Sequence, residues 1–193
     1  MPLVEGPHAD LLRDAVAAEA QGQRALLAGD AGTAGAAMRA AAGLYRASWD
    51  AAPPRSYGRL IGMLKAAVIA GDASAEARYV RAQMADAADS PPASYALALA
   101  ALVEGDDGAA GAAAAGMRGS SPAMDRAADA ITALVGSDHT AYDRVLRAIV
   151  ADFEGRAEHL TGVPIADTAL MLERLAHERG MACGAASPML PAE

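Results

Sequence analysis

The chain has 193 residues, enough for one domain with a sizeable core, and its formal net charge is −8. This negative balance argues against nucleic acid as a direct ligand and favours a basic protein partner, although it also serves simply to keep a protein in solution. Aromatic residues make up 4% of the chain and alanine, the best helix former, is abundant, so we expect a single all-α domain over residues 1–193.

The start of the chain resembles no targeting signal. Residues 1–8 lack the basic region and apolar run of a secretory leader, and the longest apolar run, residues 95–103, is about half the length needed to cross a bilayer. Cys183 is the only cysteine, which excludes a disulfide framework and suits a reducing compartment. We therefore expect a cytoplasmic protein with no membrane partner.

Four turn signals divide most of the chain into helical hairpins. Glycine tolerates the left-handed conformation that ends a helix, and aspartate can cap the next helix, so a Gly-Asp pair predicts a tight helix–turn–helix. The signals are Gly29-Asp30, Gly71-Asp72, Gly105-Asp106 and Gly136-Ser137-Asp138. Together with proline stops at residues 53–54, 91–92 and 122, they predict helices that begin near residues 7, 31, 57, 75, 91, 109 and 122.

The turn glycines are 42, 34 and 31 residues apart, and the middle value is the tetratricopeptide period. Gly105 and Pro122 also have the 17-residue separation expected between the turn glycine and the closing proline of that repeat. The Trp and Leu-Gly signature of the first repeat helix is missing. We predict an irregular helical-hairpin array, a tetratricopeptide-like α-solenoid of about nine helices. A compact helical bundle with the same turns is the alternative.

The strongest amphipathic signal lies between Thr140 and Gly180. Thr140 and Asp143 have the spacing of a capping box, and apolar residues then recur at helical spacing as far as Leu160, with Phe153 among them. Pro164 suits the first turn of a second helix over residues 165–179, which Gly180 would end. We expect this last helix to cap the array.

The residues that usually carry catalysis or bind metal do not form a recognisable motif. The four histidines (His8, His139, His159 and His177) lack the spacing of di-iron or zinc sites, and helix-end or surface roles suit them better. There is no glycine-rich phosphate loop, and Cys183 is expected to be a buried or incidental thiol. The sequence therefore predicts no cofactor, no metal and no enzymatic activity.

Acidic residues gather where neighbouring helices of the array should end. They are Asp86, Asp89, Glu104, Asp106 and Asp107. Carboxylates clustered at hairpin tips would complement a basic protein partner, so they are the candidate partner-binding residues. A solvated acidic face without a binding role is the alternative.

The C-terminal region resembles a known family. Residues 163–180, VPIADTALMLERLAHERG, and residues 186–191, ASPMLP, are similar to the C-terminus of the immunity 49 family, helical antitoxins of bacterial polymorphic toxin systems. Residues 95–104 and 138–158 are similar to that family's middle helix and long penultimate helix. The similarity is strongest over about the last 60 residues. The family usually carries more aromatic residues than this chain does.

The resemblance implies a helical protein that performs no catalysis and instead binds and blocks a toxin. It transfers no toxin-contacting residue. The first functional hypothesis is therefore an immunity protein that neutralises a cognate toxin domain; the acidic charge of the chain is compatible with a basic toxin but does not require one. The second is a generic helical-repeat scaffold or adaptor that binds a peptide in a concave groove, and the third is an enzyme with an active site between helices.

Overall fold

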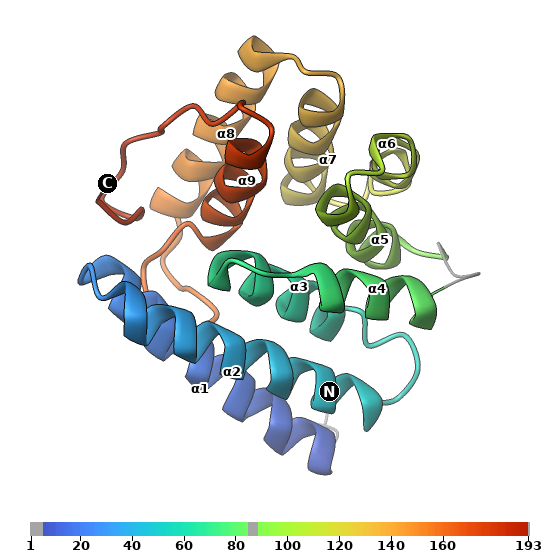
Figure 1. Cartoon of the computed structure of the whole chain (residues 1–193), viewed down its shortest axis with the longest axis vertical. Coiled ribbons are helices and arrows are strands. Elements are labelled where there is room, and N and C mark those ends of the chain that lie inside the picture. Colours follow the sequence, from blue (N-terminus) through green and yellow to red (C-terminus); the bar gives the residue numbers. More distant parts are fainter. Residues whose placement is uncertain (1–5, 85–88, 193) are drawn as a thin grey trace.

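The structure, a computed structural model, describes residues 6–84 and 89–192, which form nine α-helices and no strand (Figure 1). The predicted all-α fold is confirmed. The helices are α1 (Pro7–Leu27), α2 (Ala31–Asp50), α3 (Gly58–Ala70), α4 (Ser74–Gln83), α5 (Pro91–Glu104), α6 (Asp107–Ala115), α7 (Pro122–Val135), α8 (His139–Glu154) and α9 (Asp167–Glu178). None of these described helices is long and apolar enough to span a membrane.

The helices turn at the four predicted places, but the N-cap of α4 is Ala73 and not Asp72, and Ser137 instead of Gly136 adopts the left-handed conformation after α7. Gly71 and Gly105 adopt left-handed backbone conformations, with φ of 100° and 75°, at the ends of α3 and α5. Aspartates then start the next helices: the carboxylate of Asp30 accepts a hydrogen bond from the Thr33 N–H, and Asp106 accepts one from Ala109. These caps are local in sequence, so each turn is specified by its own residues.

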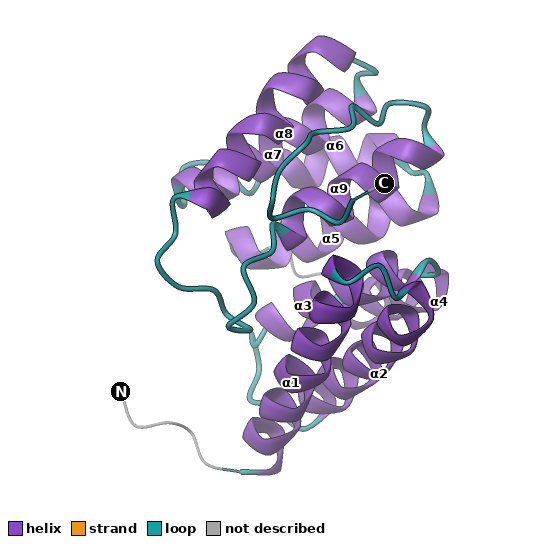
Figure 2. Cartoon of the chain, turned by 90° about the vertical axis from the view of Figure 1, so that its left-hand side faces the viewer, coloured by secondary structure: helices purple, strands orange, loops and turns teal. Residues whose placement is uncertain are grey.

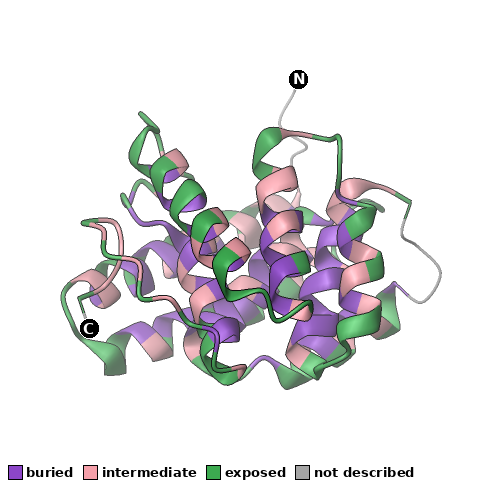
Figure 3. Ribbon diagram, turned by 90° about the horizontal axis from the view of Figure 1, so that it is seen from above, coloured by how far each residue is buried: buried purple, intermediate pink, exposed green. Residues whose placement is uncertain are grey.

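Helices that follow one another in the chain pack together, and α3, α5 and α7 are also in contact in succession. In this succession α3 packs on α5 and α5 on α7, while α2, α4, α6 and α8 complete the hairpins (Figure 1). Buried positions lie mainly on the helix sides that face the interior (Figure 3). Helix α5 is buried nearly all round, and its small side chains, including Ala96, Ala98 and Ala100, let neighbouring helices approach closely.

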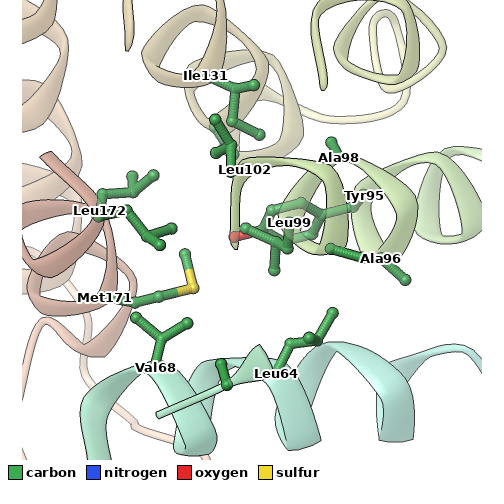
Figure 4. Packing of buried hydrophobic residues seen from close by; sticks show 14 of the residues in the cluster. Leu64, Val68, Tyr95, Ala96, Ala98, Leu99, Leu102, Ile131, Met171 and Leu172 are labelled. Carbon is green, nitrogen blue, oxygen red and sulfur yellow. The ribbon is translucent and has the colours of Figure 1, made fainter. Parts of the chain in front are cut away.

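The last helix returns to the middle of the array. Helix α9 packs against α3 and α8, and Met171 lies between Val68 of α3 and Leu102 of α5, with Leu172 beside it (Figure 4). Arg179, which follows α9, donates a 2.7 Å hydrogen bond to the carbonyl oxygen of Leu102. Instead of standing beyond α8 as a terminal cap, α9 therefore covers the surface formed by α3 and α5.

The loop between α8 and α9, residues 155–166, reaches the first hairpin (Figure 2). Val163 and Ile165 pack against Ala20 of α1 in a small apolar cluster of their own. Thr161 donates a hydrogen bond to the side-chain oxygen of Gln23, also in α1. The loop thus ties the end of the chain to its beginning.

Three local predictions in the C-terminal region are wrong. The N-cap of α8 is Asp138, which accepts from the Ala141 N–H at 2.9 Å, and Thr140 lies inside the helix. Helix α8 ends at Glu154, because Gly155, a poor helix former, follows it; Leu160 is accordingly 78% exposed. Pro164 precedes α9 by three residues and is not in its first turn. In the second hairpin, α4 ends at Gln83, whereas the sequence pattern predicts a helix as far as residue 88; residues 85–88 lie outside the described residues.

Candidate functional site

Three of the five candidate acids lie together at the turn between α5 and α6. Glu104 is the last residue of α5, Asp106 caps α6, and Asp107 is its first residue. Asp89 lies beyond the opposite end of α5, which is about 20 Å long, so it is not part of this group. Asp86 lies outside the described residues.

The grouped carboxylates contact two arginines from other helices. Arg81 of α4 forms 2.9 Å contacts with both Glu104 and Asp106. Arg179 approaches Asp107 at 3.3 Å. The hydrogen bond from the Ala109 N–H, together with Arg81, lowers the pKa of Asp106 below its usual value, so this carboxylate stays ionised well into acid. These ion pairs hold the ends of α4, α5, α6 and α9 to one another.

Two acids that the sequence interpretation missed complete this end of the molecule. Asp72, from the α3–α4 turn, and Glu178, from the last turn of α9, line a shallow hollow of 90 Å³ with Val103. Glu178 also lines an adjoining hollow of 360 Å³ with Glu104 and Asp107. The Gly71-Asp72 turn signal could have placed Asp72 at this end of the molecule. Glu178 could not have been found in this way, because it joins the other acids only through the return of α9 to the middle of the fold.

We call these five carboxylates the acidic edge: Asp72, Glu104, Asp106, Asp107 and Glu178. Their contacts include two arginines, Arg81 and Arg179, so three negative charges are in excess (5 − 2 = 3). Such an excess attracts a positively charged surface, an effect that salt weakens.

Asp89, at the far end of α5, has a different environment. Its carboxylate lies 2.7 Å from the Arg55 guanidinium and accepts a 3.1 Å hydrogen bond from the Tyr57 hydroxyl. Both contacts come from the α2–α3 connection and the start of α3. Asp89 therefore serves to join the second and third hairpins, and its charge is already paired.

A second polar centre lies in the interior, between α1, α2, α3 and the start of α9. The Lys65 ammonium lies 2.6 Å from the Asp167 carboxylate, and their side chains are only 15% and 12% exposed. Beside them, Glu19 accepts a 2.6 Å hydrogen bond from the Tyr45 hydroxyl and a 3.2 Å bond from the Gln23 amide. Burial alone would lower the pKa of Lys65, but Asp167 and Glu19 raise it above its usual value, so Lys65 remains charged.

The single cysteine is not activated as a nucleophile. Burial, and then the nearby Glu173 and Asp143 carboxylates, raise the pKa of the Cys183 thiol to about 12. The Glu173 carboxylate accepts hydrogen bonds from the Tyr142 hydroxyl and from the Cys183 and Gly184 N–H groups. This arrangement fastens the C-terminal tail to α8 and α9 and keeps the thiol protonated.

Metal binding finds no support in the parts of the chain that are described. Across residues 6–84 and 89–192, no three His, Cys, Asp or Glu side chains converge in a way that could hold a metal ion.

Comparison of the chain with models of known protein families, with curated proteins and with solved structures found no match.

Proposed function

We propose that this protein is a non-enzymatic protein-binding module that acts as an immunity protein and neutralises a cognate bacterial toxin domain. The resemblance of residues 163–180 and 186–191 to the immunity 49 family supports the toxin as partner. The helical-hairpin architecture is compatible with that family's helical character. In this function the protein blocks the toxin by occupying its surface.

The acidic edge is the surface that would meet the toxin. The observation that carries this assignment is the excess of three negative charges where the ends of α3, α5 and α9 converge. A basic toxin domain would be drawn to this end by long-range attraction, which speeds association and disfavours acidic competitors. The shallow hollows between the carboxylates offer space for protruding basic side chains of the partner.

The position of α9 weighs against the scaffold hypothesis in its simplest form. A peptide ligand in the groove of a helical-repeat protein would need the surface of α3 and α5, and here Met171 and Leu172 of α9 cover part of that surface (Figure 4). The five apolar residues of α9 that face the interior are nearly inaccessible: Ala169, Met171, Leu172, Leu175 and Ala176. A peptide would have to displace a helix that belongs to the core.

The direct test is to search the genes beside this one for a toxin and to co-express its toxin domain with this protein. We expect the protein to rescue growth and to form a complex that elutes as one species on size exclusion. Cell death despite co-expression, with no complex, would refute the immunity function. A complex with a housekeeping or signalling protein, and none with the toxin, would favour the scaffold hypothesis.

The surface assignment has its own test. The double variant Asp107→Lys/Glu178→Lys reverses two charges of the acidic edge and spares Asp106, which caps α6. We expect slower association with the toxin and a weaker salt dependence of binding. The matched control, Asp14→Lys/Glu158→Lys, reverses two exposed acids away from this edge and should bind as the wild type does. Equal effects of the two double variants would show that net charge, and not this surface, matters.

A further inference from the structure

A cavity of 200 Å³ lies at the opposite end of α9 from the acidic edge, about 18 Å away along the helix. It is enclosed by α1, α3, the end of α8 and the loop that precedes α9. Its polar lining comes from Gln23, Lys65, Arg156, His159, Thr161, Asp167 and Thr168. Its apolar lining comes from Phe153, Leu160, Val163 and Ile165. No interaction at the acidic edge uses these residues.

The surroundings of this cavity are less acidic than the chain as a whole. Phe153, Arg156 and Thr168 also line an adjoining cavity of 180 Å³, to which Arg126 and Asp152 belong. Lys65 is matched by Asp167, whereas Arg126 and Arg156 share the single carboxylate of Asp152. Glu19, which lies beside Lys65 and Asp167, adds a third carboxyl group, so basic and acidic side chains are equal in number around the cavity. In a protein of net charge −8, such a balanced region repels an anion less than the rest of the surface does.

Helix α9 begins at this cavity without a side-chain cap. Its N-cap is Ala166, which has no hydrogen-bonding side chain. The first helical hydrogen bond runs from the Leu170 N–H to the Ala166 carbonyl oxygen. The N–H groups of the first turn, including that of Thr168, thus carry the positive end of the helix dipole at the cavity wall. Helix N-termini of this kind favour oxyanions.

A buried donor or acceptor without a partner lies in the same wall. His159 stacks on Phe153 with ring centroids 6.2 Å apart, and its Nδ1 is buried without a hydrogen bond to any described residue. Arg156 covers the Phe153 ring at 3.7 Å. An imidazole nitrogen held in this way can donate a hydrogen bond to a ligand oxygen, and buried polar atoms are rarely left unsatisfied.

We propose that this cavity binds a small organic anion whose carboxylate or phosphate group lies against the first turn of α9, between Arg156 and His159. The apolar body of the ligand would contact Val163, Ile165 and Phe153. The cavity is smaller than the roughly 300–1,000 Å³ of pockets for drug-sized ligands, so the ligand is a simple acid and not a nucleotide. This site is independent of the proposed toxin interface.

The test is a titration of the whole, isotopically labelled protein with sodium benzoate, sodium acetate and inorganic phosphate, each followed by two-dimensional NMR. Sodium chloride at equal ionic strength is the reference. We expect at least one of these anions to shift the Thr168 and Ala169 amides and the His159 ring saturably, with a dissociation constant below about 10 mM. Tighter binding of benzoate and acetate identifies a carboxylate ligand, and tighter binding of phosphate identifies a phosphate ligand.

Two variants make the test specific. R156Q removes a charge-assisted donor and should weaken binding about tenfold, while T168V should weaken it less. R147Q is the matched control, because Arg147 of α8, like Arg156, forms an i,i+4 pair with an aspartate (Asp143) but does not line the cavity. The proposal is overturned if no anion gives saturable shifts beyond those of chloride, or if R156Q and R147Q bind the anion equally.

Discussion

Glu19 is the most deeply buried acidic residue that the structure describes, with 1% of its surface exposed. It contacts a tyrosine hydroxyl and a glutamine amide, and the nearest cation, Lys65, is already paired with Asp167. Burial, the largest cause, raises the pKa of Glu19 above its ordinary value of 4.5, against the opposing effect of Lys65. The folded protein therefore holds this proton more tightly than the unfolded chain does.

This shift predicts a pH dependence of stability. Below pH 4.5 Glu19 is protonated in both states. As the pH rises, the unfolded chain ionises first, so the free energy of unfolding falls until the pH passes the raised pKa of the folded state. In Glu19→Gln this contribution is absent, and the side-chain oxygen can still accept from Tyr45.

Urea unfolding of both proteins over a series of pH values measures the effect. We expect the stability of the wild type, relative to Glu19→Gln, to decline as the pH rises above 4.5. Parallel curves for the two proteins would show that Glu19 titrates normally in the fold.

At the scale of a single helix, the structure and the sequence pattern assign the N-cap of α8 to different residues. The structure assigns the cap to Asp138, whereas the capping-box pattern assigned it to Thr140. Asp138→Ala should destabilise the protein by about 1 kcal/mol, since the Ala141 N–H loses its partner. Thr140→Ala should change stability by less than about 0.5 kcal/mol, because Thr140 is exposed inside the helix. Denaturant unfolding of both variants gives the comparison, and a larger effect at Thr140 would contradict the assignment.

The contact between α2 and α3 depends on a glycine. A Cβ added at Gly62 would lie 2.8 Å from the Tyr45 ring, which cannot move freely because its hydroxyl is bonded to Glu19. Gly62→Ala should therefore destabilise the protein by about 1–3 kcal/mol.

Gly43, in the middle of α2, is the matched control. A Cβ there meets nothing within 4 Å, so Gly43→Ala should stabilise the protein by up to about 1 kcal/mol through helix propensity alone. Thermal unfolding of the two variants should show shifts of opposite sign. Stabilisation by both substitutions would mean that α2 and α3 pack less closely than the structure shows.

At the scale of the whole molecule, we expect α9 to couple the helices that it contacts. Met171 is fully buried between α3 and α5, so Met171→Ala leaves a cavity at their junction and should destabilise the protein by about 2–5 kcal/mol. Hydrogen exchange should then accelerate in α3 and α5 as well as in α9, because the three helices share this contact. Faster exchange confined to α9 would show that α9 is a separable flap and not part of the common core.

The sequence by itself predicted the helices, most of their ends and their pairing into hairpins. These features depend on local physical chemistry: glycine permits the left-handed turn, aspartate caps the next N–H groups, and apolar residues at helical spacing mark the buried face. The errors near Thr140 and Leu160 arose where two local signals competed, Asp138 with Thr140 and the apolar stripe with Gly155.

The acidic edge, our proposed binding surface, was grouped only in part from the sequence. Glu104, Asp106 and Asp107 are neighbours in sequence and so were easily grouped, whereas Asp89 lies at the far end of the same helix. Glu178 was missed because it reaches the acidic edge through the return of α9, a contact between residues more than 70 positions apart.

Only the tertiary structure decided where α9 lies, which buried charges pair and where cavities remain. Lys65 and Asp167 are 102 residues apart, and nothing in either local sequence indicates the other. Such pairings follow from the packing of the whole array, since an apolar helix face specifies that a helix is buried but not against which partner. The sequence thus determined the helices and the acidic character of the chain, while the long-range packing of α9 determined both the acidic edge and the cavity at its other end.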